Sequence, residues 1–210
     1  MVDLTIIAKS VIEGEKEKIR ELVQQAISEG VTADRLLSEG LIAGMNVVGG
    51  RMKRREIYLP EVLLSATSMH AGMDVLRPLL AASGAALGPK VILGTVKGDI
   101  HDVGKNLVGM MLTGAGFQLV DLGKDTPAEG FVLAAREEEA QVVAMSALLT
   151  TTMPQMRNTI EALKEAGLRE KVKVIVGGAP VSPEYAEQIG ADGYARDAAT
   201  AVDRVKELVR

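Results

Sequence analysis

The pair Asp99 and His101 has the clearest chemical potential in this sequence. His101 is one of two histidines, and Asp99 stands two residues before it, within reach of one imidazole nitrogen. A carboxylate on one ring nitrogen fixes the tautomer and makes the other nitrogen a stronger metal donor. The spacing therefore predicts a histidine prepared to bind a metal, against the simpler interpretation of a surface or capping histidine.

The composition limits the kind of metal that His101 could hold. The chain has no cysteine, and the second histidine, His70, falls in a predicted helix, so nothing completes a tetrahedral metal site. A metal already held by four equatorial nitrogens needs only an axial ligand. We therefore expect a metal macrocycle rather than a bare ion.

Two further segments carry residue types suited to ligand binding. Residues 146–152 hold four hydroxyl side chains, of which Thr152 has the alternative role of capping the next helix. Residues 177–180 read Gly-Gly-Ala-Pro, and glycines also flank His101 at positions 98 and 104. Glycine lets the backbone approach a bulky ligand closely.

The elements that must position these segments follow from hydrophobic patterning. Predicted strands cover residues 91–94, 117–120, 142–145 and 174–176, with a weaker fifth near 193–194. Predicted helices cover residues 104–115, 127–139, 153–167, 182–190 and 197–209. This alternation predicts a Rossmann-like, flavodoxin-like α/β domain with five parallel strands. The three segments follow the first, third and fourth strands, where ligands of such sheets bind.

The first half of the chain has helical periodicity throughout. Apolar residues predict four helices that begin near Leu4, Ile19, Thr32 and Pro60, with Thr32 as an N-cap and Pro60 as a first helical residue. Short links between them predict an antiparallel four-helix bundle. We expect a helical domain over residues 1–88 and an α/β domain over 89–210, joined by a small-residue linker at 82–90. If a family resemblance makes the helical half a cap, the linker is the candidate hinge.

Bulk properties exclude several classes of protein. The net charge of −4 argues against a nucleic-acid binder, and no apolar run has the length of a membrane span. The start of the chain lacks a signal-peptide pattern, which favours a cytoplasmic protein. Aromatic residues make up only 2%, which argues against stacking of bases or sugars.

The three segments together resemble a known family, the cobalamin-binding proteins related to the corrinoid module of methionine synthase. Asp99-Ile100-His101-Asp102-Val103-Gly104 is followed after 41 residues by Ser146-Ala147-Leu148, and after 28 more by Gly177-Gly178. Met45-Asn46-Val47-Val48-Gly49 and Tyr58-Leu59-Pro60-Glu61-Val62 are similar to the cap of methyl-carrying modules. Within the family, the chain most resembles the stand-alone corrinoid proteins of three-component methyltransferase systems.

The resemblance assigns roles by position. His101 would be the lower axial ligand of cobalt, with the corrinoid bound base-off because His101 displaces its benzimidazole. Asp99 would pair with His101, and Thr152 would complete a proton relay. Met52, Leu59 and Val62 would cover the upper, methyl-bearing face. The remaining cofactor contacts would be Gly98, Asp102, Val103, Gly104, Ser146, Leu148, Thr150, Gly177, Gly178 and Ala179.

The function implied by this resemblance is that of a methyl carrier. Co(I) would accept a methyl group from a substrate-specific methyltransferase that acts on a methylamine, betaine, methanol or aryl methyl ether. The methylcobalamin form would deliver it to a second methyltransferase that uses tetrahydrofolate or coenzyme M, and a reductive activator would restore Co(I). The chain alone would not form a complete active site.

Three alternatives remain at this point. An adenosylcobalamin mutase subunit shares the motifs but lacks the helical half. A non-catalytic B12 sensor usually adds a DNA-binding domain and a cap rich in aromatic residues, whereas this chain has no tryptophan. A flavodoxin-like FMN domain would leave the Asp99–His101 motif unexplained.

Overall fold

A computed structural model describes residues 3–83 and 88–210 of the chain. Clustering of contacts divides the chain into two compact units, one made of Met1–Gly88 with Thr113–Gly116, the other of Pro89–Leu112 with Phe117–Arg210. Part of the linker predicted at 82–90 falls on residues 84–87, which lie outside the described residues. Across the described part of the chain, no helix combines the length and apolar composition of a membrane span.

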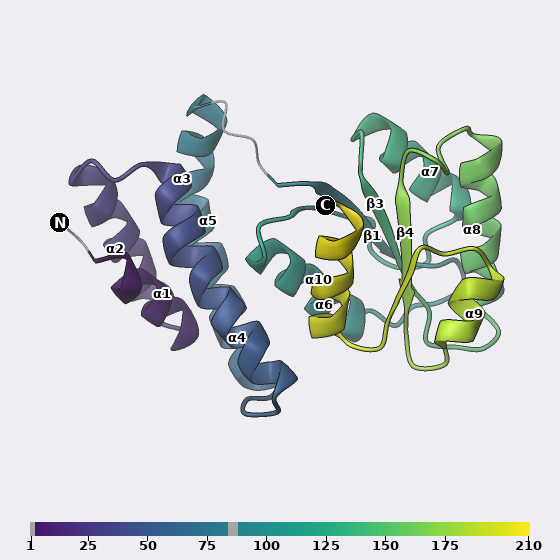
Figure 1. Ribbon diagram of the computed structural model, residues 1–210, viewed down its shortest axis with the longest axis horizontal. Helices are drawn as coiled ribbons and strands as arrows, with labels where there is room; N and C mark the ends of the chain where they lie inside the picture. The colour runs from purple at the N-terminus through teal and green to yellow at the C-terminus, as the bar shows by residue number, and fades with distance from the viewer. Residues whose placement is uncertain (1–2, 84–87) are drawn as a thin grey trace. The chain divides into compact units, whose positions relative to one another are not determined.

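The first unit is helical (Figure 1), as its periodicity predicted. Its elements are α1 (Leu4–Ile12), α2 (Lys16–Ser28), α3 (Ala33–Arg35), a π-helix η1 (Leu36–Ile42), α4 (Ala43–Lys53) and α5 (Leu59–Ser83). The third predicted helix is thus one continuous helical segment with a π-helical middle, which periodicity alone did not predict. Thr32 occupies the N-cap position of α3, but its side chain makes no capping hydrogen bond.

The apolar positions that predicted these helices form the core of the helical unit. Buried side chains recur at intervals of three and four residues on every long helix, as an amphipathic helix requires. Two buried serines join α5 to the end of α1: the Ser65 hydroxyl donates to the Ile12 carbonyl at 3.1 Å, and the Ser68 hydroxyl donates to the Ser10 carbonyl at 3.3 Å.

The second unit is a five-stranded parallel sheet with helical connections, which confirms the predicted α/β fold. Its strands are β1 (Lys90–Thr95), β2 (Gln118–Asp121), β3 (Val142–Ser146), β4 (Lys173–Gly177) and β5 (Gly193–Ala195). Its helices are α6 (Val103–Gly114), α7 (Ala128–Glu137), α8 (Pro154–Glu165), α9 (Pro183–Gln188) and α10 (Ala198–Leu208). The strand order is β2-β1-β3-β4-β5.

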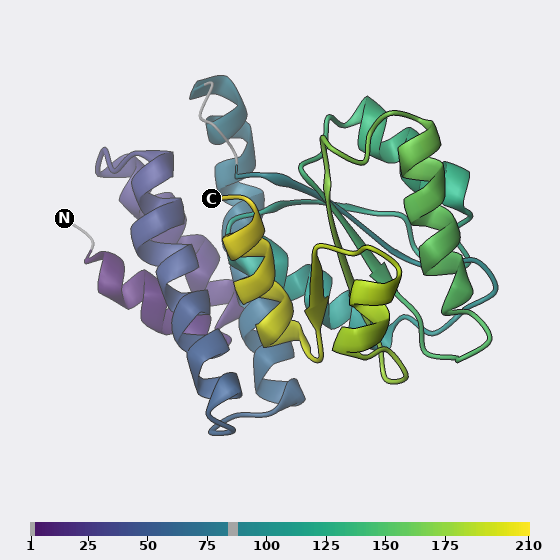
Figure 2. The ribbon, with the colours of Figure 1, turned by 45° about the vertical axis from the view of Figure 1, so that its right-hand side comes forward.

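Helices cover both faces of this sheet. Figures 1 and 2 show α7, α8 and α9 on one face and α6 and α10 on the other. On the first face, Ile92, Val143 and Val174 pack in one cluster with Phe131 of α7 and Ile160 of α8. Strands buried on both faces explain why the central strands are continuous apolar runs.

Strand register brings the three segments singled out in the sequence to one edge of the sheet. Thr95 at the end of β1 pairs with Ser146 at the end of β3, and Ser146 pairs with Gly177 at the end of β4. β2 lies on one side of β1 and β3 on the other, so the strand order changes direction between β1 and β3. The carboxyl ends of the strands at such a point are the usual ligand site of a parallel sheet.

Candidate functional site

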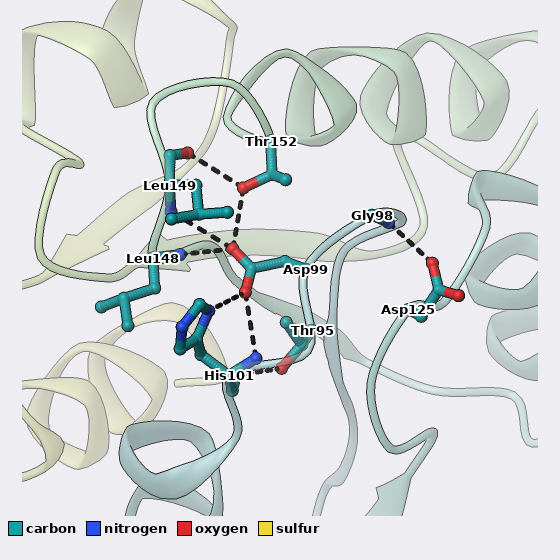
Figure 3. A network of polar contacts seen from close by, with 8 residues as sticks. All are labelled: Thr95, Gly98, Asp99, His101, Asp125, Leu148, Leu149 and Thr152. Carbon is teal, nitrogen blue, oxygen red and sulfur yellow. Dashed lines mark hydrogen bonds and ion pairs between the residues drawn. The ribbon is translucent and has the colours of Figure 1, made fainter.

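Asp99 is the centre of the site (Figure 3), and its side chain is fully buried. Its Oδ1 accepts the backbone N–H of His101 at 3.1 Å and pairs with His101 Nδ1 at 2.8 Å. Its Oδ2 accepts the backbone N–H groups of Leu148 at 2.7 Å and Leu149 at 3.2 Å. It also accepts the Thr152 hydroxyl at 2.7 Å. One carboxylate therefore links the loop after β1 to the loop after β3.

These donors keep Asp99 ionised despite its burial. Burial alone would raise the pKa of the Asp99 carboxyl, because it removes the charge from water. The hydrogen bonds from Leu148, Thr152 and His101 outweigh that effect and hold the pKa well below its usual range. The Asp99 carboxylate therefore places a fixed negative charge next to the His101 imidazole at neutral pH.

The orientation of His101 follows from that charge. An ionised carboxylate only accepts hydrogen bonds, so Nδ1 carries a proton, and in the neutral imidazole the lone pair of Nε2 is free. Nε2 has no hydrogen-bond partner among the residues that the structure describes, and 47% of the side chain is exposed. The Thr95 hydroxyl donates to the His101 carbonyl at 3.0 Å and fixes the backbone below the ring.

Exposed apolar side chains stand beside His101 on both loops. Ile100 and Val103 are 65% and 72% exposed, and Leu148 and Leu149 are each 42% exposed. Large apolar side chains left in solvent at a polar site indicate a surface that a ligand covers. The sequence analysis did not include Ile100 and Leu149 among the site residues, because the sequence does not show whether an apolar residue in a loop is buried or exposed.

Asp125 is a second residue that the sequence analysis missed. It lies in the segment after β2, with a backbone φ of 55° that non-glycine residues seldom adopt. Its Oδ1 accepts the Gly98 N–H at 2.7 Å, and its own N–H donates to the Asp99 carbonyl at 3.0 Å. Gly98 has φ of 81°, which explains glycine at the start of this loop.

The glycines predicted at the site differ in what surrounds them. A Cβ added to Gly104 would meet nothing within 4 Å, so a ligand has room there. At Gly178, where φ is 130°, a Cβ would lie 1.8 Å from the Ala147 carbonyl oxygen. At Gly177 it would lie 2.7 Å from the Ala195 carbonyl oxygen. The protein's own backbone therefore requires the Gly177-Gly178 pair, whatever a ligand needs.

The structure places the remaining predicted residues as follows. Thr152 does not cap α8, whose N-cap residue is Met153, because its hydroxyl points to Asp99. Ser146 and Asp102 are half-buried, while Thr150 and Ala179 are exposed at the same sheet edge. In the helical unit, Met52 and Leu59 are half-buried. Val62 is fully buried there.

The donor set fits a metal macrocycle better than a free ion. The described residues contain no group of three or more side chains of His, Cys, Asp or Glu that could hold a metal. His101 offers one nitrogen donor, oriented by a carboxylate on the opposite ring nitrogen, which is the arrangement of an axial ligand. The exposed apolar side chains beside it suit the face of a large ring.

Comparison with known proteins agrees with this geometry. One family model, described as a B12 binding domain, matches residues 89–203, and a second B12 binding domain model matches residues 4–77. A corrinoid protein of Desulfitobacterium hafniense is 44% identical, over 96% of this chain and 94% of that protein. A dimethylamine corrinoid protein of Methanosarcina acetivorans is 44% identical, over 97% of this chain and 95% of that protein.

Two solved structures share the whole fold. A cobalamin-binding protein from Desulfitobacterium hafniense superposes with a TM-score of 0.81 at 32% identity, and covers 100% of both chains. The methanol:cobalamin methyltransferase complex of Methanosarcina barkeri superposes with a TM-score of 0.86 at 33% identity, over 97% of this chain and 78% of that chain. The fold is thus that of a B12-binding protein. The chain belongs to the family of corrinoid proteins of methyltransferase systems, as its motifs predicted.

Proposed function

We propose that this protein is a corrinoid methyl carrier that binds its cofactor base-off, with His101 Nε2 as the lower axial ligand. The observation that carries this proposal is the half-exposed His101 side chain, whose Nδ1 pairs with the buried Asp99 carboxylate and whose Nε2 has no hydrogen-bond partner among the described residues. A bound corrinoid supplies methyl-transfer chemistry because its cobalt can alternate between Co(I) and methyl-Co(III).

In this proposal Asp99, His101 and Thr152 control a single proton. Asp99 holds the proton of Nδ1, so the Nε2 lone pair is available to the metal. The Thr152 hydroxyl donates to Asp99 and helps to keep that charge in place.

The other predicted residues would surround the cofactor. Ile100, Val103, Leu148 and Leu149 offer apolar surface for the lower face of the corrin ring. Ser146 and Thr150 would contact the nucleotide tail, and Gly177 and Gly178 would leave room for it. The further cofactor contacts would be Gly98, Asp102, Gly104 and Ala179. Met52, Leu59 and Val62 would cover the methyl-bearing face.

The relatives suggest the class of partner and substrate. Dimethylamine, trimethylamine and monomethylamine corrinoid proteins match this chain, as does the methanol:cobalamin methyltransferase complex. We propose a methylated amine or methanol as the methyl source and a methyltransferase specific for it as the first partner. A second methyltransferase, using tetrahydrofolate or coenzyme M, and a reductive activator would complete a cytoplasmic one-carbon system.

Nitrogen labelling of histidine tests the axial ligand directly. The protein would be produced with ¹⁵N-histidine, loaded with cobalamin and reduced to the Co(II) state for electron paramagnetic resonance. Ligation by His101 predicts a two-line splitting of each cobalt line from ¹⁵N, whereas the benzimidazole of the cofactor would give three lines from ¹⁴N. His101→Ala should abolish the two-line pattern, and His70→Ala, which removes the other histidine, should leave it unchanged. A three-line pattern in the labelled wild-type protein would refute the proposal.

The alternatives have less support. Relatives at 40–44% identity over almost the entire chain are corrinoid proteins named for methylamines, which favours a methyl carrier over a mutase subunit or a sensor. The B12 binding domain match over residues 89–203 disfavours an FMN domain.

A further inference from the structure

Lys105 is a buried charged residue, and the proposed function described above assigns it no role. Of the residues that the structure describes, Asp99 and Lys105 are the two charged side chains that are buried. Lys105 lies in the first turn of α6, four residues after His101. Its ammonium donates to Asp121 Oδ1 at 2.7 Å and Oδ2 at 2.6 Å, and to Asn106 Oδ1 at 2.7 Å.

A buried lysine in an ion pair calls for an explanation other than stability. Removing a charge from water costs free energy that the attraction to its partner often only balances, so a pair of apolar side chains in place of a buried ion pair is commonly as stable. Buried lysines are correspondingly rare. Asp121 ends β2, the edge strand, and its Oδ1 also accepts the Gly123 N–H at 2.8 Å. The pair therefore joins α6 to the start of the segment that follows β2.

That same segment holds the other end of the His101 loop. Asp125 Oδ1 accepts the Gly98 N–H, and the Asp125 N–H donates to the Asp99 carbonyl. The loop that carries Asp99 and His101 is thus fixed to residues 121–125 before the histidine, through Asp125, and after it, through Lys105. Neither contact involves the imidazole itself.

We infer that Lys105, through Asp121, is a positioning residue for the axial histidine, an inference that rests on the proposed function. With both ends of the loop fixed, His101 loses little conformational freedom when Nε2 becomes a ligand. With the Lys105 end released, the entropy lost on ligation increases and the ligated fraction falls. Loss of a group that is hydrogen-bonded to a metal ligand commonly weakens metal binding by about 10–100-fold, and a residue one contact further out should cost no more than the lower end of that range.

The test uses Lys105→Met and a matched control. Methionine keeps an unbranched apolar chain and removes the ammonium. Arg169→Met removes another ion pair of the sheet unit, in which Arg169 Nη2 lies 2.9 Å from Asp192 Oδ2, with both side chains mostly buried. Asp192 also accepts the Val174 N–H near the start of β4. This ion pair therefore lies at the amino-terminal end of the strands, whereas His101 follows the carboxyl-terminal end of β1. Each variant would be labelled with ¹⁵N-histidine, loaded with cobalamin and compared at one pH.

The expected result is a ratio of histidine-ligated to unligated Co(II) about tenfold lower in Lys105→Met than in wild type. Arg169→Met should keep the wild-type ratio even if its Tm falls, and Lys105→Arg should recover part of the loss. Asp121→Asn, nearly isosteric, should reproduce the effect and replaces Lys105→Met if that variant does not fold. Folded Lys105→Met and Asp121→Asn with wild-type ratios would overturn the inference, as would an equal fall in Arg169→Met. Failure of the proposed function is distinct, because the wild-type protein itself would then lack the two-line pattern.

Discussion

Asp99 and His101 are joined twice, because one carboxylate oxygen contacts both the backbone N–H and the Nδ1 of the same histidine, at 3.1 and 2.8 Å. The backbone contact fixes the position of the His101 main chain, and the ring contact fixes the orientation of its imidazole. The other carboxylate oxygen is held by a different loop, so the histidine is oriented relative to the whole sheet edge.

Replacing Asp99 by asparagine tests whether the charge of this side chain, and not only its shape, is needed for stability and corrinoid binding. The amide nitrogen of the new side chain would face either the donors on the β3 loop or the histidine, and would leave buried donors without an acceptor. We expect a loss of about 1–3 kcal/mol in the free energy of unfolding. Corrinoid affinity should fall by about 10–100-fold, since the tautomer of His101 is no longer fixed. Urea unfolding and a cobalamin titration measure the two effects; a variant with wild-type affinity would contradict this role of Asp99.

The pH dependence of stability follows from the same carboxylate. The pKa of Asp99 in the folded protein lies below its value in the unfolded chain, which is about 3.9. Asp99 therefore contributes stability above that pH, and loses it as pH falls from about 4 toward the folded pKa. The difference in unfolding free energy between wild type and Asp99→Asn should be constant from about pH 7 to 5 and shrink below about pH 4. A difference that grows on acidification would contradict the sign of the shift.

Thr152 provides a test of the hydroxyl that donates to Asp99. Thr152→Val keeps the shape of the side chain and removes the donor, so we expect a loss of about 1.5–3 kcal/mol, the range for hydrogen bonds to charged groups. Thr152→Ser should be much closer to wild type in corrinoid affinity. Thr159→Val is the control, because the Thr159 hydroxyl donates only to the Gln155 carbonyl of its own helix, at 2.9 Å, and should cost less. Equal losses in both valine variants would argue against a special role for Thr152.

Two glycine variants separate folding from cofactor binding. Gly178→Ala should destabilise the apoprotein by about 3 kcal/mol or more, because the new Cβ meets the Ala147 carbonyl and φ is 130°. Gly104→Ala meets nothing and should leave the apoprotein unchanged or stabilise it by up to about 1 kcal/mol. If the corrin ring packs at this position, Gly104→Ala will nevertheless weaken cobalamin binding. Thermal unfolding of the apoproteins and cobalamin titration give both quantities, and unchanged affinity would place the ring elsewhere.

Much of the fold and part of the site could be predicted from local sequence patterns. The apolar runs beginning at Val91, Val142 and Val174 identified the three central strands within one residue of their bounds. The spacing of Asp99 and His101 predicted their contact, because two residues in one tight loop cannot lie far apart. The π-helical segment Leu36–Ile42 had no such signal, since its apolar residues have the same spacing as in an α-helix.

By itself, then, the sequence determined the alternation of strands and helices, the loops that follow the strands, and the histidine with its neighbouring carboxylate. Only the tertiary structure showed that Leu148, Leu149 and Thr152 donate hydrogen bonds to Asp99. It alone also showed that Lys105 pairs with Asp121, and that the Ala147 carbonyl leaves no room for a side chain at position 178. The physical reason is register: these contacts join residues distant in the chain. They exist because parallel pairing sets Asp121 beside Leu93, and Thr95, Ser146 and Gly177 side by side. Periodicity predicts each strand, but it contains no information on which residue of the next strand lies opposite.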